Sequence, residues 1–440
     1  MNRYDITIIG AGPGGYVAAL YAAGRGKKVL VIEENEIGGV CLNWGCIPTK
    51  TFITSAETLR IIKRSKEFGI DAGIPTIDYK NIKRRKDDVV STLKKGIESL
   101  FRSKKIELMK GRGRLAGRGA VEVNGEEIES KDIIIATGSR PAELPNFKFD
   151  GERILSSAEL LEIERLPKKM LIIGGGVNGC EYAYTYRHFG VDVTIVELLD
   201  RLLPTMDREL GKNMEMLLKK AGVKVMTETR LDQAAPEYDK TVVCVGRRYN
   251  TEDLGLEKAG VKTDKGRIVV GDDLMTNVPG IYAIGDAIGG YLLAHVASHE
   301  GVVACDNILG EKTRMDYGSV PFCIYTEPQI ATTGITEQEA KDKGRDVKVS
   351  KFPFRGIGKS HAIGERDGFV KIIADAKSGE VLGVQMVGHL VTELIAEAAM
   401  AVKRGMKTSD ICGQIHAHPT LSEAFMEAAF SSCGRPIHSL

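Results

Sequence analysis

The chain has 440 residues, too many for a single hydrophobic core, and this length predicts roughly two to four domains. Hydrophobic residues make up 43% and charged residues 27%, which is typical of a folded globular protein. The net charge of +2 gives no support for nucleic acid or an anionic membrane surface as a partner.

A strand pattern begins by Tyr4, which leaves no room for a signal peptide. No apolar run approaches the ~18 residues that a membrane helix needs. We therefore expect a cytoplasmic protein that does not bind membranes.

The N-terminal segments follow the order of a βαβ unit: an apolar strand at 5–9, a glycine turn at 10–15, a helix at 16–25 and a second strand at 28–32. The turn matches the GxGxxG fingerprint through Gly10, Gly12 and Gly15, and Glu33 closes the second strand. Such glycines let the backbone approach a pyrophosphate at a helix N-terminus, and the acid accepts a hydrogen bond from a ribose hydroxyl. A dinucleotide is therefore expected here.

The same pattern recurs downstream: a strand at 169–173, a glycine turn at 174–179, a helix at 180–189 and a strand at 192–196. The second fingerprint contains Gly174, Gly176 and Gly179, with Glu197 as its acid. A carboxylate at this place suits a free 2′-hydroxyl and repels a 2′-phosphate, which favours NAD over NADP, although Arg201 lies close by. Two such units imply two nucleotides.

The remaining segments frame these units. Residues 56–106 are polar, Lys-rich and helical, and are expected to form an excursion from the first domain. Three strands that end in glycine follow at 133–138, 241–246 and 281–286. From about residue 317, alternating segments at 369–374 and 381–387 lead into an apolar helix at 392–404. This change predicts a separate C-terminal α+β domain.

Eight cysteines are present, and six of them are scattered singly among apolar or helical residues, which indicates small buried hydrophobes. Cys41 and Cys46 form the one tight pair, in an expected loop before a helix that starts at Pro48. Closing so short a loop would stabilise the fold by only roughly 2 kcal/mol. A helix N-terminus and the nearby Lys50 would favour a thiolate, as a redox disulfide needs. The alternative, half of a metal site, is weaker because no second ligand cluster exists, and no metal is expected.

A second candidate site lies near the C-terminus, where His416, His418 and Glu423 fall close together. A histidine can take a proton from a thiol near neutral pH, and a carboxylate on its other nitrogen fixes the tautomer. A pair of surface histidines is the equally weighted alternative.

These motifs resemble those of the flavoprotein disulfide reductases, and among them the dihydrolipoamide dehydrogenases, over essentially the whole chain. The resemblance rests on GGVCLNWGCIPTK at 38–50, both glycine fingerprints, ATGS at 136–139, GRRYNT at 246–251, AIGD at 283–286, LLAH at 292–295, YTEP at 325–328 and HAHPTLSEAF at 416–425. It implies an α/β fold with two Rossmann-like domains, for FAD and NAD, and a C-terminal α+β dimerisation domain. The implied bounds are 1–143 (FAD), 144–252 (NAD), 253–317 (a segment returning to the FAD domain) and 318–440 (interface).

The resemblance also assigns roles. Cys41 is similar to the thiol that exchanges with substrate, and Cys46 to the thiol that packs on the flavin. Lys50 resembles the lysine near the flavin's reactive nitrogen, with Glu181 as its ion-pair partner. His418 and Glu423 resemble a base and its orienting acid, which reach the partner subunit's cysteines in a homodimer and leave His416 a bystander. The His418–Pro419 bond is expected to be cis.

Further nucleotide contacts follow from the same resemblance. The residues expected to bind FAD are Gly10, Gly12, Gly15, Glu33, Lys50, Gly113, Thr137, Gly138, Ser139, Asp286 (on the ribityl chain), Leu292, Leu293, Ala294 and His295. Those expected to bind NAD are Gly174, Gly176, Gly179, Glu181, Glu197 and Gly246.

The implied reaction is oxidation of dihydrolipoyl groups through the cysteine pair and FAD, with reduction of NAD⁺. The chain contains no lipoyl domain, so a lipoyl-bearing acyltransferase or carrier protein would bind in trans. Three features depart from the family pattern: a short segment at 231–240, expected to be a trimmed meander, Gly-Arg-Arg-Tyr at 246–249, and Trp44 beside the cysteines. Because Trp44 could redirect access, the alternative is an NADH-dependent reductase of another low-molecular-weight disulfide.

Overall fold

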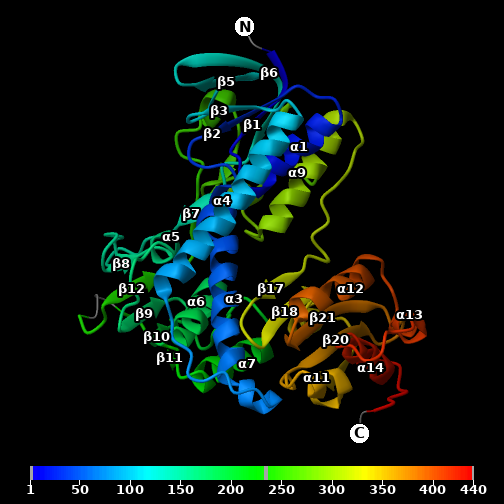
Figure 1. Ribbon diagram of the computed structural model, residues 1–440. Helices are drawn as coiled ribbons and strands as arrows, with labels where there is room; N and C mark the ends of the chain where they lie inside the picture. The colour runs from blue at the N-terminus through cyan, green and yellow to red at the C-terminus, as the bar shows by residue number, and fades with distance from the viewer. Residues whose placement is uncertain (1–2, 232–235, 439–440) are drawn as a thin grey trace.

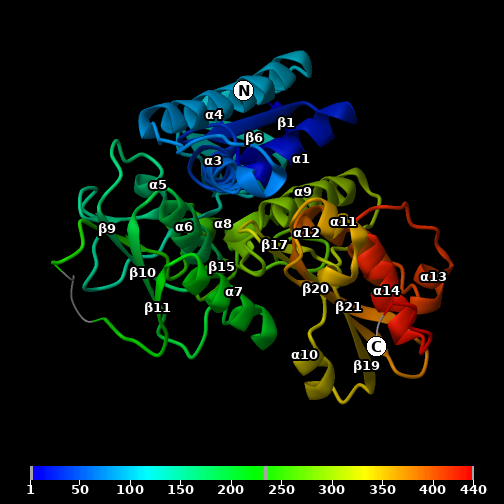
Figure 2. The same cartoon turned by 60° about the horizontal axis from the view of Figure 1, so that its bottom comes forward.

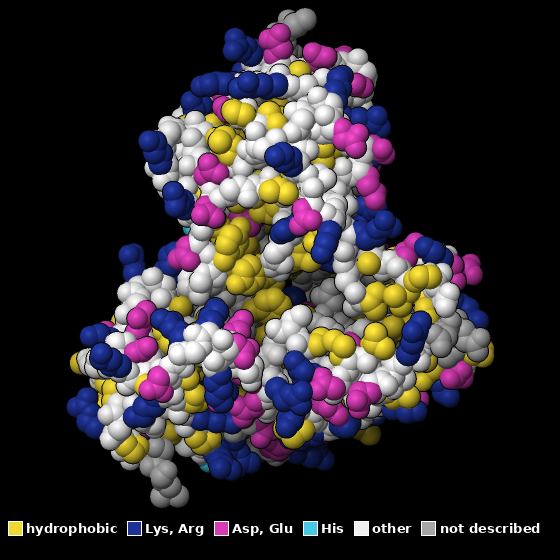
Figure 3. All heavy atoms as spheres, turned by 180° about the vertical axis from the view of Figure 1, so that it is seen from behind, with side chains coloured by type: hydrophobic (Ala, Val, Ile, Leu, Met, Phe, Trp, Pro, Cys, Tyr) yellow, Lys and Arg dark blue, Asp and Glu magenta, His cyan; other side chains and the backbone are white. Residues whose placement is uncertain are grey.

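The computed structural model describes residues 3–231 and 236–438. It divides into three lobes, with two long helices running from the N-terminal lobe down between the other two (Figure 1 and Figure 2). Among the described residues, no helix is both long and apolar enough to cross a membrane. Seen from behind, hydrophobic side chains gather where the three lobes meet, beside a hollow in the surface (Figure 3).

The N-terminal lobe is built on a sheet in the order β3-β2-β1-β6-β5-β4, and β16 pairs with the C-terminal residues of β6, beyond those that pair with β5. Its strands are β1 (Arg3–Ile9), β2 (Val29–Glu33), β3 (Glu107–Lys110), β4 (Arg114–Gly117), β5 (Ala120–Val123), β6 (Glu126–Ile135) and β16 (Ile281–Ala283). The apolar runs form parallel strands because helices bury them: α1 (Pro13–Gly24) packs along α9 (Ala294–Leu309). Segments that precede the middle lobe in the sequence and a strand that follows it therefore form one sheet.

The middle lobe has a five-stranded parallel sheet in the order β11-β10-β9-β12-β8. Its elements are β8 (Ile154–Leu155), α5 (Ser157–Leu160), β9 (Lys169–Ile173), α6 (Val177–His188), β10 (Asp192–Val196), α7 (Arg208–Lys220), β11 (Lys224–Met226) and β12 (Lys240–Val243). A small ladder of β7 (Ser139–Pro141) with β13 (Arg247–Tyr249) joins the two crossings to the N-terminal lobe. The predicted trimmed meander at 231–240 falls partly on 232–235, which lie outside the described residues.

The C-terminal lobe is an antiparallel sheet, β17-β18-β21-β20-β19, with helices packed on it. Its elements are β17 (Phe322–Ile324), β18 (Gln329–Gly334), α10 (Glu337–Asp342), β19 (Val347–Pro353), α11 (Gly358–Ala362), β20 (Phe369–Asp375), β21 (Val381–Gly388), α12 (Val391–Lys403), α13 (Thr408–Gly413) and α14 (Glu423–Ser432). The predicted fold class is confirmed. The alternating segments at 369–374 and 381–387 form β20 and β21, which are buried almost throughout, and the buried Lys371 of β20 is paired with Glu337 and Asp207.

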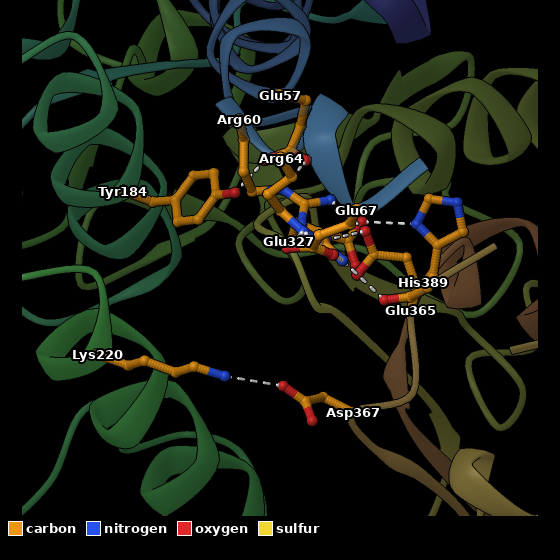
Figure 4. Close-up of polar contacts among 11 residues, drawn as sticks. Glu57, Arg60, Arg64, Glu67, Tyr184, Lys220, Glu327, Glu365, Asp367 and His389 are labelled. Carbon is orange, nitrogen blue, oxygen red and sulfur yellow. Dashed lines mark hydrogen bonds and ion pairs between the residues drawn. The ribbon is translucent and has the colours of Figure 1, made fainter. Parts of the chain in front are cut away.

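A polar cluster joins the lobes at the C-terminal end of α3 (Cys46–Lys63), the helix that packs along α4 (Tyr79–Ser103), and Figure 4 shows the cluster. Arg60 on α3 and Arg64, the C-cap of α3, both bind Glu365 of the C-terminal lobe, at 2.8 and 2.6 Å. Glu57, one turn earlier, accepts a hydrogen bond from Tyr184 on α6. Two further pairs lie nearby: Lys220–Asp367 and His389–Glu327. Helix α3 is thereby connected to the middle lobe through Tyr184 and to the C-terminal lobe through Glu365.

Candidate active site

The first glycine turn has the geometry of a pyrophosphate cradle. Gly10 has a φ of +106°, a conformation that a side chain would strain. A Cβ on Gly15 would lie 1.9 Å from the carbonyl oxygen of Gly10, so only glycine fits. Gly12 begins α1 without a side-chain cap, which leaves backbone N–H groups of the first turn available to an anion.

The second glycine turn repeats this geometry in the middle lobe. Gly174 has a φ of +109°, and a Cβ on Gly179 would lie 2.0 Å from the carbonyl oxygen of Gly174. Gly176 begins α6, again without a side-chain cap. Nothing lies within 4 Å of the place where a Cβ on Gly176 would stand, so this turn is open at Gly176, whereas a Cβ on Gly175 would meet Leu202 at 2.5 Å.

Each turn is closed by the predicted acid. Glu33 accepts a 2.6 Å hydrogen bond from the Ala11 N–H, and Glu197 accepts one of the same length from the Gly175 N–H. The guanidinium of Arg201, which made the NAD preference uncertain, is held by Asp200 at 2.9 Å. Arg201 is thus engaged elsewhere, and the charge at the second turn is that of Glu197.

Ser139 and Asp286, predicted to contact FAD, lie together between the strand ends. Ser139 donates to Asp286 and accepts a 2.6 Å hydrogen bond from Arg247, whose Nε lies 3.4 Å from Asp286. Glu300 of α9 accepts a 2.6 Å bond from the Gly285 N–H, and burial raises the pKa of its carboxyl. Arg247 and Glu300 were not predicted; an acid inside an apolar helical run was the available signal for Glu300.

The other predicted FAD contacts surround the same place. Thr137 keeps a buried hydroxyl oxygen without a hydrogen-bond partner, and Gly138 has a φ of +69°. A Cβ on Gly113 would stand 3.1 Å from Ile9 of β1. The 292–295 stretch forms the start of α9: Leu292 and Leu293 precede Ala294, Leu293 is an N-cap without a side-chain bond, and His295 Nε2 lies 2.9 Å from the Pro321 oxygen.

These features fit a bound dinucleotide. The turn would clash with any side chain, two helices begin with uncapped N–H groups, and a buried hydroxyl lacks a partner. An anionic group with hydrogen-bonding sugar hydroxyls satisfies all three.

The cysteine pair differs in local structure from the prediction. Cys41 lies within a short helix, α2 (Gly39–Trp44), and Cys46 is the first residue of α3, so the expected loop up to Pro48 is wrong. Both sulfurs are free thiols. Among the described residues, no group of three or more His, Cys, Asp or Glu side chains could hold a metal ion.

The two thiols have divergent proton affinities. A hydrogen bond from Cys41 and the charge of Lys50 lower the pKa of Cys46 to about 7, although burial opposes them. The same hydrogen bond, together with burial, raises the pKa of Cys41. The pair therefore releases its first proton from Cys46, at the N-terminus of α3.

Lys50 joins all three lobes. Its Nζ lies 2.8 Å from Glu181 of α6, whose side chain is fully buried, and 4.5 Å from the centre of the Tyr325 ring. The other oxygen of Glu181 accepts a 3.0 Å bond from the Tyr325 N–H. The predicted ion pair is present, and it fixes Lys50 one turn after Cys46.

His418 and Glu423 form the predicted pair at 2.8 Å, and the His418–Pro419 bond is cis as predicted. Burial acts to raise the pKa of Glu423, but bonds from His418 and the Thr420 N–H outweigh it and lower that pKa. The His418 side chain is 76% exposed. His416 is of intermediate exposure as a whole, but its side chain is only 4% exposed and its Nε2 lies 3.0 Å from Glu397. Within the described part of one chain, His418 contacts neither Cys41 nor Cys46.

Trp44 lines a cavity of about 560 Å³ between α2 and α4. Lys86, Lys94 and Glu98 of α4 lie on the opposite wall. Trp44 follows Cys41 by three positions on α2, and residues at this spacing are neighbours on a helix surface. From α2 the cavity is lined by Asn43 and Trp44, and not by Cys41.

Two cysteines outside this site contradict the interpretation of scattered single residues. Cys412 on α13 and Cys433 at the end of α14 place their sulfurs 3.5 Å apart. Cys180 and Cys305 are fully buried, as predicted.

Comparison with known proteins gives full-length matches. Residues 4–301 match the family model described as pyridine nucleotide-disulphide oxidoreductase, and residues 320–429 match its dimerisation domain. A dihydrolipoyl dehydrogenase of Bacillus subtilis (strain 168) is 42% identical over 99% of each chain. One of Thermus scotoductus is 43% identical over 100% of each.

Solved structures agree with this result. LpdA from Mycobacterium tuberculosis superposes with a TM-score of 0.92 at 28% identity, covering 98% of this chain and 99% of that one. RclA from Escherichia coli, a HOCl-induced flavoprotein disulfide reductase, does so with a TM-score of 0.87 at 27% identity, with the same coverage.

Proposed function

Because this chain belongs to the pyridine nucleotide-disulphide oxidoreductase family, we propose that it oxidises dihydrolipoyl groups to lipoyl groups and reduces NAD⁺, with FAD as its bound cofactor. The observation that carries the proposal is the position of the coupled thiols. Helix α2 contacts the first glycine turn, where Gly39 meets Gly12, and α3 contacts the second nucleotide unit through Lys50 and Glu181. A dithiol at this junction adjoins both nucleotide units, as a relay from the dithiol through FAD to NAD⁺ requires.

The thiols divide the exchange between them. A dihydrolipoyl thiolate attacks the sulfur of Cys41 in the oxidised pair, and the bond to Cys46 breaks. Cys46 leaves as a thiolate, which its pKa of about 7 and the cation of Lys50 favour. The second substrate thiol then displaces Cys41, which releases the lipoyl ring and leaves both cysteines reduced. FAD, when bound, supplies the relay of two electrons from the thiolate to the nicotinamide.

A base from the other subunit completes this scheme. The chain forms a homodimer through its C-terminal lobe. His418 is exposed and apart from the cysteines of its own chain, and Glu423 orients its Nδ1. We assign the first substrate proton to Nε2 of His418 of the partner subunit. The predicted FAD and NAD contact sets and the four domain bounds belong to the same proposal, and the divided sheets support the bounds.

NAD⁺ is the proposed acceptor because Glu197 places a carboxylate at the second turn while Asp200 holds Arg201. The dihydrolipoyl group would arrive on an acyltransferase or carrier protein in trans. A cytoplasmic location, where thiols are kept reduced, is part of this proposal.

A second candidate function is NADH-dependent reduction of another low-molecular-weight disulfide. The cavity beside Trp44 favours it, because a bulky indole on the same short helix as Cys41 lines this cavity together with three lysine and three glutamate side chains. Replacement Trp44→Val would then lower activity with that disulfide and raise activity with dihydrolipoamide.

Anaerobic titration of the FAD-loaded dimer with dihydrolipoamide tests the proposal. We expect a broad long-wavelength absorbance band from a thiolate against the flavin, then NADH on addition of NAD⁺ and none with NADP⁺. Cys41→Ser should abolish reduction by dihydrolipoamide but not by NADH. If the wild-type protein is reduced by NADH and never by dihydrolipoamide, the lipoyl assignment is wrong and the second candidate stands.

A further inference from the structure

The C-terminal lobe contains a second close pair of cysteines, separated from the first by sequence and by lobe. Cys412 on α13 donates a hydrogen bond to the sulfur of Cys433, 3.5 Å away, and Cys433 in turn contacts the Thr408 hydroxyl at 3.4 Å. The two helices pack against each other near the C-terminus (Figure 1). Formation of a disulfide at about 2.0 Å would need the sulfurs to move by only roughly 1.5 Å.

The surroundings of this pair differ from those of the buried cysteines. Both side chains are partly exposed, whereas Cys180 and Cys305 are fully buried. Cys433 caps the end of α14, next to exposed residues 434–438. Burial and the hydrogen bond to Cys433 raise the pKa of Cys412 to about 12, against the charge of Arg435. Cys412 therefore keeps its proton, and Cys433 is the better placed to react first.

We propose that Cys412 and Cys433 are a second redox-active pair, which a low-molecular-weight disulfide oxidises by thiol–disulfide exchange. The Cys433 thiolate attacks one sulfur of the disulfide, whose S–S bond breaks and releases one thiolate. Cys412 then loses its proton and attacks Cys433, which breaks the mixed disulfide and releases the second thiolate. Two electrons pass from the pair to the small disulfide, and the two cysteine protons go to the two released thiols.

The bond would constrain the segment that carries the proposed base. Cys412 and Cys433 bracket residues 413–432, which include His418 and Glu423. Glu423 begins α14 and Cys433 caps it, so drawing that helix toward α13 displaces the His418–Glu423 pair. This consequence rests on the proposed function. Because small misplacements of a catalytic group are costly, we expect NAD⁺ reduction to slow roughly tenfold on oxidation.

Peptide mapping of the FAD-loaded dimer treated with bis(2-hydroxyethyl) disulfide tests the pair without reference to activity. After alkylation of free thiols, we expect a cross-linked peptide that joins Cys412 and Cys433. Cys433→Ser and Cys412→Ser are matched controls, and the remaining thiol should form only a mixed disulfide with the probe. Absence of the cross-linked peptide at every ratio of disulfide to thiol would overturn the proposal, whether or not dihydrolipoamide is a substrate.

The link to His418 has its own readout. The pH profile of NAD⁺ reduction should change on oxidation of the wild-type dimer and stay fixed in both serine variants, which we expect to retain FAD and basal activity. A cross-linked wild type with an unchanged rate and pH profile would overturn the coupling to His418.

Discussion

The two glycine turns of this molecule have nearly the same backbone geometry but lie in different surroundings. Gly10 and Gly174 have φ values of +106° and +109°. A Cβ on Gly15 would lie 1.9 Å from the carbonyl oxygen of Gly10, and a Cβ on Gly179 would lie 2.0 Å from that of Gly174. Their acids close the turns with backbone bonds of equal length, 2.6 Å. A short sequence pattern therefore produces the same local structure twice.

The surroundings differ in what covers each turn. A Cβ on Gly39 of α2 would lie 2.6 Å from the Cα of Gly12, and Gly14 packs against Ala297 of α9. At Gly176 nothing lies within reach. A covered turn suits a cofactor that stays bound between turnovers, and an open one suits a coenzyme that enters and leaves. We therefore expect segments distant in sequence, more than the turn itself, to set how long each nucleotide stays bound.

The largest expected effects come from adding one methyl group to each turn, in the variants Gly15→Ala and Gly179→Ala. Gly15→Ala forces α1 away from Gly10 in the covered unit, so we expect a protein without FAD and without activity toward any acceptor. Gly179→Ala causes the same crowding in the open unit. It should keep FAD and reduction by dihydrolipoamide, while NAD⁺ reduction falls on the order of 100-fold. Flavin absorbance per chain, with NAD⁺ and ferricyanide assays, measures both.

Gly96→Ala on α4 is the control, because nothing lies within 4 Å of its Cβ position and alanine suits a helix interior. It should leave FAD content and both activities unchanged. Loss of FAD in Gly179→Ala as complete as in Gly15→Ala would mean that the two units cannot be separated.

A second prediction concerns the thiolate beside the covered turn. With a pKa of about 7, Cys46 is a thiolate above that pH and gains a proton as the pH falls through it, so the long-wavelength band of the reduced enzyme should fade toward acid. Lys50→Gln removes a cation that lowers this pKa. The midpoint of the fading should then move to higher pH, by roughly one pH unit or more.

Lys50→Arg keeps the positive charge beside Glu181 and is the matched control for that shift. A midpoint that stays near 7 in Lys50→Gln would show that the hydrogen bond from Cys41 sets the pKa without Lys50.

Sequence reasoning succeeded where neighbours in the chain make the structure. Each fingerprint is a contiguous strand, turn and helix, so its geometry could be predicted. The Lys50–Glu181 contact, 131 positions apart, came only from family resemblance. The Cys412–Cys433 pair was missed because hydrophobic pattern gives no sign that α14 folds back on α13.

The smallest expected effect tests the acids that close the two turns. In Glu197→Gln, the amide oxygen can still accept a hydrogen bond from the N–H of Gly175 or of Leu199. The NH₂ group then faces the other N–H, with which it cannot form a hydrogen bond, and the negative charge is lost. Hydrogen bonds to a charged group contribute about 1.5–3 kcal/mol, so KM for NAD⁺ should rise on the order of tenfold. The preference for NAD⁺ over NADP⁺ should narrow, because the repulsion of a 2′-phosphate disappears.

Glu33→Gln makes the same chemical change in the covered turn, where Glu33 accepts from Ala11 and Asn35. With FAD held at this turn between turnovers, as proposed, KM for NAD⁺ should stay the same and the loss should appear as faster release of FAD on dialysis. The two variants thus test how long each nucleotide stays bound. Glu197→Gln should change KM for NAD⁺, and Glu33→Gln should change the rate at which FAD dissociates. If Glu197→Gln released FAD and left KM for NAD⁺ unchanged, the assignment of the open turn to the exchanging coenzyme would be wrong.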